Sequence, residues 1–150
     1  MGHSIIRLTI EIDKSAHVFV GHDVNFRPGC NFRIRENSEL HVGDNVDFNN
    51  NCILTCRKKI FIGNNVMFGP NVLIFDNDHD YLADDFAHNY LTEQIIIEDN
   101  VWIGGNVCIL RGAHIKSGSV IGAGSVVKGV VENNTLYYNK QNIQIKRIIK

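Results

Sequence analysis

The sequence has 150 residues, of which 15 are Lys or Arg and 16 are Asp or Glu, and its formal net charge is −1. This length suffices for one domain with a real core, and the balanced charge argues against a basic surface of the kind that binds nucleic acid or anionic lipid. No stretch approaches the roughly 18 apolar residues of a membrane span and no signal peptide is recognisable, so we expect a cytoplasmic protein.

Four short segments repeat along the chain. Each starts as an alternating strand, continues with Gly or Glu and two polar turn residues, and ends in Val. They read VFVGHDV from Val18, LHVGDNV from Leu40, IFIGNNV from Ile60 and IIIEDNV from Ile95. Such self-similarity predicts a solenoid of stacked coils.

A finer period of six residues underlies these segments. Aliphatic or Phe residues recur at this spacing, as in the run Ile97, Ile103, Ile109, Ile115, Ile121 and Val127. A small residue usually lies four places further on, up to Val131, and Gly often follows directly, as at Gly43 and Gly104. We expect the aliphatic side chain to point inward, the small residue to fit the corner, and Gly and Asn to supply positive φ. Three units make one coil of about 18 residues, stacked through parallel ladders.

The register breaks most strongly between Ile62 and Ile97, which are 35 residues apart. The extra residues lie around 75–94 and read FDNDHDYLADDFAHNYLTEQ. A long loop on a rigid scaffold is usually functional or disordered, and its aromatic residues favour packing. It contains His79, and a histidine with a pKa near 6.5 suits a general base.

Two other stretches are candidates for ligand binding. The first is FNNNC, from Phe48, whose asparagines either face a substrate or form an asparagine turn or ladder. The second is NVWIGGNV, from Asn100, which holds the only Trp of the chain. Its two glycines would allow a ligand to approach the backbone, although the corner of a coil could also require them.

This pattern resembles the hexapeptide-repeat family of left-handed β-helix transferases over roughly Val18 to Val131. The resemblance implies an all-β fold, namely a left-handed parallel β-helix forming one domain over 1–150, with a loop insertion at about 75–94 and a short C-terminal tail. It also implies a homotrimer with active sites between subunits. The implied activity is transfer of an acetyl group from acetyl-CoA to a sugar hydroxyl, with no metal.

The resemblance implies His79 as the general base, because the family carries its catalytic histidine in such a loop. His88 is the rival base. Asp78, Asp80 or a backbone carbonyl could orient the imidazole. The residues expected to bind the acceptor are Asn51, Asn49, Asp78 and Tyr81.

The resemblance also implies a channel for CoA. The residues expected along the pantetheine arm are Trp102, Gly104, Gly105 and Ala123, the last within IGAGSVV. The cations expected at the phosphates are Lys128, Lys146 and Arg147. The chain departs from the family after its last coil, where YYNKQN from Tyr137 replaces a G-N-P-A type turn.

The compact chain looks like the O-acetyltransferases that modify bacterial capsule, O-antigen or other surface polysaccharide. Three alternatives remain open: an acetyltransferase for a small molecule, of the maltose, galactoside or xenobiotic type; a non-catalytic assembly module; and a γ-type carbonic anhydrase, which needs three zinc-binding histidines. The four cysteines form no CxxC pair, and we expect them to be small buried side chains rather than disulfides.

Overall fold

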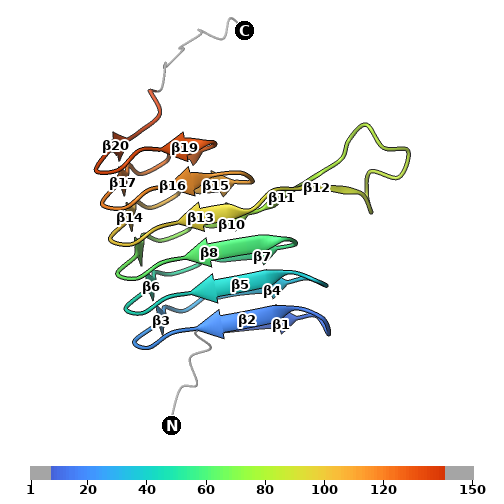
Figure 1. Cartoon of the computed structure of the whole chain (residues 1–150), viewed down its shortest axis with the longest axis horizontal. Coiled ribbons are helices and arrows are strands. Elements are labelled where there is room, and N and C mark those ends of the chain that lie inside the picture. The colour runs from blue at the N-terminus through green and yellow to red at the C-terminus, as the bar shows by residue number, and fades with distance from the viewer. Residues whose placement is uncertain (1–7, 141–150) are drawn as a thin grey trace, which may run out of the picture.

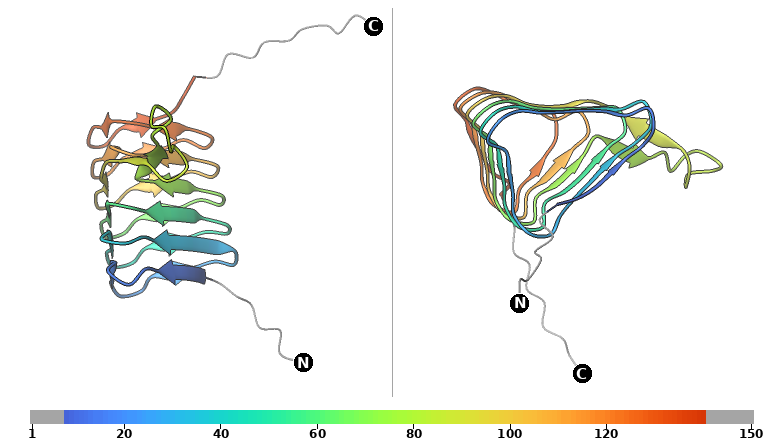
Figure 2. Two further views of the ribbon diagram at one scale, coloured as in Figure 1. Left: turned by 90° about the vertical axis from the view of Figure 1, so that its right-hand side faces the viewer. Right: turned by 90° about the horizontal axis from the view of Figure 1, so that it is seen from below.

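The computed structural model describes residues 8–140, and all its regular elements are β-strands (Figure 1). Three six-stranded parallel sheets form the walls of a triangular prism, which Figure 2 shows along its axis. This arrangement confirms the predicted left-handed parallel β-helix. No helix in residues 8–140 is both long and apolar enough to cross a bilayer.

The three walls are named here in the order in which the chain visits them. Wall A consists of β1 (Leu8–Ile12), β4 (Cys30–Ile34), β7 (Ile53–Cys56), β10 (Leu73–Phe75), β15 (Cys108–Leu110) and β18 (Val126–Val127). Wall B consists of β2 (His17–Val20), β5 (Glu39–Val42), β8 (Lys59–Ile62), β13 (Ile95–Ile97), β16 (His114–Ile115) and β19 (Val130–Val131). Wall C consists of β3 (Asn25–Phe26), β6 (Asp47–Phe48), β9 (Met67–Phe68), β14 (Trp102–Ile103), β17 (Val120–Ile121) and β20 (Leu136–Tyr137).

The core is a set of columns in which inward side chains stack from coil to coil. On wall C, the ring of Phe48 lies parallel to those of Phe26 and Phe68, with centroids 5.2 and 4.6 Å apart. Phe48, Phe68 and the next residue of the column, Ile103, are buried. Each such side chain contributes about 1.5–3 kcal/mol on burial. The predicted inward positions are therefore confirmed for these coils.

The corners between walls are closed by residues with positive φ, most of which are asparagines. Asn51, Asn71 and Asn106 have φ of 61°, 59° and 57°, and their side-chain amides form a ladder with N···O distances of 3.2 and 3.1 Å. Gly112 and Gly118 also have positive φ, of 78° and 74°, as the sequence predicted, whereas the glycines that directly follow the inward residues do not. They are required for close stacking, since a Cβ on Gly43 would lie 2.7 Å from the carbonyl of Gly63.

The last coil is shorter than the repeat predicts. Val131 was expected at a corner as a small residue, four places after Val127. It instead pairs with Ile115 as the inward residue of β19, because the turn between β18 and β19 is only two residues long. The prediction for Val131 was therefore wrong: this residue takes the inward position of the next strand and not the corner position.

The corner between walls A and B carries the main irregularity of the solenoid. The insertion leaves β10, forms an antiparallel arm of β11 (Asn77–His79) and β12 (Tyr90–Thr92), and returns to β13. Figure 2 shows the arm projecting from this one corner. The shorter irregularities of the earlier coils lie at the same corner, in the turns 35–38 and 57–58. The A–B corner is thus where the sequence departs from a plain coil.

Candidate active site

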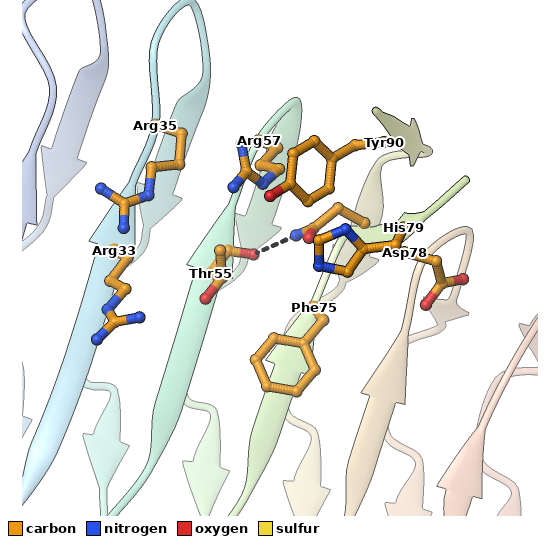
Figure 3. A pocket seen from close by; sticks show the side chains of 9 residues that line it. Arg33, Arg35, Thr55, Arg57, Phe75, Asp78, His79 and Tyr90 are labelled. Carbon is orange, nitrogen blue, oxygen red and sulfur yellow. Dashed lines mark hydrogen bonds between the residues drawn. The ribbon is translucent and has the colours of Figure 1, made fainter. Parts of the chain in front are cut away.

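A cleft of about 380 Å³ lies where the arm leaves wall A (Figure 3). Its lining comes from four successive segments of the A–B corner: Arg33, Arg35, Thr55, Arg57, Phe75, Asn77, Asp78, His79 and Tyr90. At its base, the side-chain amide of Asn77 donates a hydrogen bond to the carbonyl of Thr55 at 3.3 Å. The arm is thereby joined to the preceding coil at the point where the cleft opens.

His79 is the last residue of β11 and lines the cleft. Its Nδ1 lies 2.8 Å from the carbonyl oxygen of Phe86, across the loop of the arm. A carbonyl oxygen can only accept, so Nδ1 carries the proton and Nε2 carries the free lone pair. The imidazole is therefore held in the tautomer that a general base requires.

Of the three groups that could orient the imidazole of His79, it is the backbone carbonyl, that of Phe86, that forms a hydrogen bond with the ring. Asp78 is instead paired with Arg111, whose Nε lies 2.6 Å from its carboxylate. Asp80 accepts a hydrogen bond from the amide of Leu82. The interpretation of these two acids as orienting groups is not supported, because their carboxylates are directed to other partners.

Two other loop residues of the sequence analysis lie away from the cleft. Tyr81 is 79% exposed in the loop of the arm, and it is not part of the lining. The ring of His88 is bonded through Nδ1 to the carboxylate of Asp85 at 2.9 Å, and it too lies outside the lining. Among the loop histidines, only His79 faces the cleft.

Tyr90 and Arg57 are among the residues of the cleft to which sequence reasoning gave no role. Tyr90 pairs with His79 across the arm, and the two rings lie 4.5 Å apart between centroids. The guanidinium of Arg57 lies 3.5 Å from the centroid of the same tyrosine ring. The available signal was positional: Arg35 and Arg57 each follow a wall A strand, in the extended turns where the register of the repeat slips.

A buried carboxylate fixes the turn that carries Arg57. Asp76 is fully buried, and it accepts hydrogen bonds from the backbone amides of Arg57, Lys58 and Lys59 at 2.8, 2.7 and 2.9 Å. Asp76 is also the residue directly between β10 and β11. One side chain therefore sets the position of the arm and of the cationic turn relative to each other.

The asparagines of FNNNC lie at a different corner, between walls C and A. Asn51 belongs to the ladder described above, which is the structural alternative that the sequence left open. The side-chain oxygen of Asn49 accepts a hydrogen bond from the amide of Asn50 at 2.8 Å. Neither residue lines the cleft beside His79.

The predicted CoA channel residues lie together on this C–A corner, on later coils. A Cβ on Gly104 would lie 2.7 Å from the amide nitrogen of Ala123, so the two coils are in direct contact there. Within residues 8–140, the amides of Gly105 and Ala123 donate no hydrogen bond. Trp102 lies on the adjoining wall C and is 53% exposed. The C–A corner therefore presents two backbone amides without an acceptor among the described residues, with the ring of Trp102 beside them.

The structure therefore brings the predicted site residues together in two groups rather than one. His79 and Asp78 lie at the A–B corner, whereas Asn51, Gly105 and Ala123 lie at the C–A corner, across wall A. Lys128 is exposed just after β18. Lys146 and Arg147 lie outside the described residues.

The cysteines offer no nucleophile at the cleft. None forms a disulfide; Cys30, Cys52 and Cys56 are buried and Cys108 is partly buried. Burial, reinforced by the charge of Asp76, raises the pKa of Cys56 to about 12, so this thiol stays protonated at neutral pH. Within the part of the chain that the structure describes, no three His, Cys, Asp or Glu side chains are grouped to hold a metal ion.

Comparison with known proteins gives matches over most of the chain. Residues 94–129 match the family model described as bacterial transferase hexapeptide (six repeats). A putative acetyltransferase of Schizosaccharomyces pombe is 42% identical over 73% of this chain and 53% of its own length. The galactoside O-acetyltransferase of Lactococcus lactis is 38% identical over 66% of this chain and 48% of its own length. The chain thus spans about half the length of these two relatives.

Two further matches bear on ligands and acceptors. A putative lipopolysaccharide biosynthesis O-acetyltransferase of Escherichia coli is 27% identical over 88% of this chain and 72% of its own length. Among solved structures, a hexapeptide-repeat acetyltransferase of Vibrio cholerae in complex with acetyl-CoA superimposes with a TM-score of 0.71. It is 34% identical and covers 80% of this chain and 64% of its own.

Proposed function

Because this chain belongs to the hexapeptide-repeat acetyltransferase family, we propose that it transfers an acetyl group from acetyl-CoA to a sugar hydroxyl. One observation carries the proposal: the imidazole of His79 lines a cleft with its Nδ1 bonded to the carbonyl of Phe86, which leaves Nε2 free to accept a proton. Histidine is the side chain best suited to that role near neutral pH.

In the proposed reaction, Nε2 of His79 removes the proton of the acceptor hydroxyl. The oxygen then attacks the thioester carbonyl, the carbon–sulfur bond breaks, and the CoA thiolate takes the proton from the imidazolium. The carbonyl of Phe86 and the ring of Tyr90 both stabilise the imidazolium while it carries that proton. None of the four cysteines lines the cleft beside His79, which speaks against a covalent acyl-enzyme on a cysteine.

We assign acetyl-CoA to the C–A corner. The amides of Gly105 and Ala123 have no acceptor within residues 8–140 and can donate to the pantetheine arm or to the thioester oxygen. Trp102 provides a ring at the side of this edge. Lys128, expected at a phosphate of the nucleotide, is exposed after β18 at the A–B corner, across wall A from this edge.

Two corners must meet for this reaction, and we propose that they meet between subunits of a homotrimer. Apolar side chains are exposed on both walls beside the C–A corner: Met67, Trp102 and Leu136 on wall C, and Ile53 and Val126 on wall A. The arm also exposes Leu82 and Phe86. Covering such surfaces in an assembly is favourable. Light scattering that found a stable, fully active monomer would contradict this part of the proposal.

We propose a bacterial surface polysaccharide or its precursor as the acceptor, with a small galactoside as the alternative. The support is the name of the Escherichia coli relative for the first and that of the Lactococcus lactis relative for the second. We expect the reaction in the cytoplasm, since none of the four cysteines is in a disulfide.

The test is release of free CoA thiol over a panel of sugars and surface oligosaccharides. We expect H79A to lose about 10²- to 10⁴-fold in kcat, the usual contribution of a general base. H88A is the matched control in the same loop and is expected to keep its activity, since His88 lies outside the cleft. Equal activity of H79A and the unmodified protein would overturn the assignment of the base.

A further inference from the structure

The cleft beside His79 has three arginines in its lining and one carboxylate. The carboxylate is that of Asp78, whose charge is offset by Arg111 outside the lining. The arginines are Arg33, Arg35 and Arg57. Figure 3 shows Arg33 and Arg35 on the side away from His79, and Arg57 between them and His79, next to Tyr90. The lining itself therefore holds more cationic than anionic side chains close to the general base.

Arg57 is the arginine whose charge is not matched. It forms no ion pair within the described residues, and its guanidinium is held against the ring of Tyr90. Its backbone is fixed by Asp76, so the cation does not depend on a flexible turn for its position. A guanidinium held against an aromatic ring keeps its N–H donors available in the plane of the fork.

The other two arginines extend the positive surface toward the N-terminal end. The pairing of β4 with β7 puts Arg33 beside Thr55. Arg35 directly follows β4, and Arg57 directly follows β7, so these two arginines occupy equivalent places on neighbouring coils. Both arginines have acidic neighbours: Glu11 lies 3.8 Å from Arg33 and 3.3 Å from Arg35, and Asp13 lies 3.5 Å from Arg35. These partly exposed pairs are long, and such pairs are weak.

The position along the solenoid axis separates this cleft from the site assigned to CoA. Arg35 and Arg57 follow β4 and β7, and both strands come before the strand that leads to His79. Gly105 follows β14, on the same coil as β10, and Ala123 follows β17, on the next coil. The arginines thus lie toward the N-terminal end from the general base, whereas the thioester channel runs from the coil of the base toward the C-terminal end, which leaves room for the acceptor beside the arginines.

We propose that the acceptor carries a carboxylate or phosphate group, and that Arg57 binds this anion while the hydroxyl meets Nε2 of His79. The inference rests on the proposed function and narrows its substrate to an acidic or phosphorylated sugar. A guanidinium and a carboxylate or phosphate form paired, charge-assisted hydrogen bonds. A neutral sugar would leave the charge of Arg57 without a partner.

The test compares matched sugars by equilibrium binding, independently of turnover. Dissociation constants are measured by ligand-observed NMR for galactose, galacturonic acid and galactose 1-phosphate, and for the same series built on glucose. In at least one series we expect an anionic member to bind at least about tenfold more tightly than its neutral parent. A larger gain in affinity for the uronic acid would indicate a carboxylated acceptor, and a larger gain for the sugar phosphate would indicate a phosphorylated one. If no anionic sugar binds more tightly than its parent, the inference is wrong.

Two variants assign the effect to the cleft. R57Q is expected to abolish the preference for the anion. K59Q removes the same charge from the first residue after the turn of Arg57, but Lys59 is paired with Glu39 at 2.7 Å outside the cleft, so this variant is expected to retain the preference. A preference that persists in R57Q would overturn the inference, as would a tenfold loss of CoA affinity in R57Q, since that would assign the arginine to the co-substrate.

Failure of the inference and failure of the proposed function are distinguishable. Thiol release with neutral sugars alone would keep the acetyltransferase and remove the anionic acceptor. Tighter binding of an anionic sugar without thiol release by any acceptor would keep the anion site and remove the acetyltransferase.

Discussion

The rings of His79 and Tyr90 face each other across the two strands of the arm, 4.5 Å apart between centroids and tilted by 39°. This contact links the proposed base to the cationic turn, because the same tyrosine ring supports Arg57. The site therefore depends on a short stack of side chains from two segments of the chain.

The ring of Tyr90 should matter more than its hydroxyl. Y90L removes the aromatic face, and we expect kcat/KM to fall by about tenfold, which corresponds to the upper range of one cation–π contact. Y90F keeps the face and loses only the 3.2 Å hydrogen bond to the carbonyl of Ala87, so its kcat/KM should change less than about threefold. Thiol-release kinetics on both variants decide the point; equal losses would assign the effect to the hydroxyl.

Substitution of Asp76 should affect both stability and activity. In D76N, one of the two carboxylate oxygens becomes an amide that directs its own hydrogens at backbone N–H groups. We expect the free energy of unfolding to fall by about 3 kcal/mol and kcat/KM to fall with it, because Arg57 and the arm lose their common support.

Asp99 provides the control for this substitution. It is a similar acid whose carboxylate accepts, among residues 8–140, one backbone hydrogen bond, from Asn64 at 2.7 Å, and this bond is exposed. D99N should therefore cost less than about 1 kcal/mol in urea unfolding at the same protein concentration. A loss for D99N as large as that for D76N would contradict the role given to Asp76.

The asparagine ladder makes a prediction about backbone conformation. Asn71 has φ of 59° and bonds to Asn51 below and Asn106 above. N71A loses both side-chain contacts and keeps a Cβ in the left-handed region without the polar side chain that lets Asn tolerate it, so we expect a loss of about 2 kcal/mol. N71G loses the contacts but tolerates the φ, so its loss should be smaller. Chemical unfolding of the pair tests this order, which a purely hydrogen-bonding role for Asn71 would not produce.

Stability should depend on pH through Glu98. Hydrogen bonds from His114, at 2.7 Å, and from Ser117 hold the pKa of the Glu98 carboxyl below its usual value of 4.5. A carboxyl with a lowered folded-state pKa stabilises the fold above about 4.5, and this contribution is lost as the pH falls through the lowered value. E98Q should therefore flatten the fall in thermal midpoint below pH 4.5. If the thermal midpoint of E98Q falls below pH 4.5 as steeply as that of the unmodified protein, other groups determine the acid sensitivity.

The six-residue period predicted the coils and most inward positions because each coil repeats the same local requirement. An inward side chain must pack against the side chains above and below it in its column. Similar apolar residues therefore recur at a fixed spacing, as for Phe48 and Phe68. The corners were less well predicted. Their asparagines, and glycines such as Gly112 and Gly118, do adopt positive φ. The glycines that directly follow the inward residues instead serve the close approach of neighbouring coils, which is a property of the stack rather than of one turn.

Val131 illustrates the same limit, since the short turn before it became evident only from the pairing of β19 with β16. The cleft was predictable only in part. His79 stands out in the sequence because the insertion interrupts a strict period. Arg57 and Tyr90 do not, because their contact joins a turn and an arm strand that are far apart in the sequence.

The sequence by itself determined the solenoid, its inward columns and the place where a histidine leaves it. These features follow from local spacing, which every coil repeats. Only the tertiary structure decided which carbonyl orients that histidine, that Asp78 turns to Arg111, and that the glycine edge and the histidine lie on separate corners. The physical reason is that these relationships depend on how an irregular arm folds back on the stack, and no repeat constrains that.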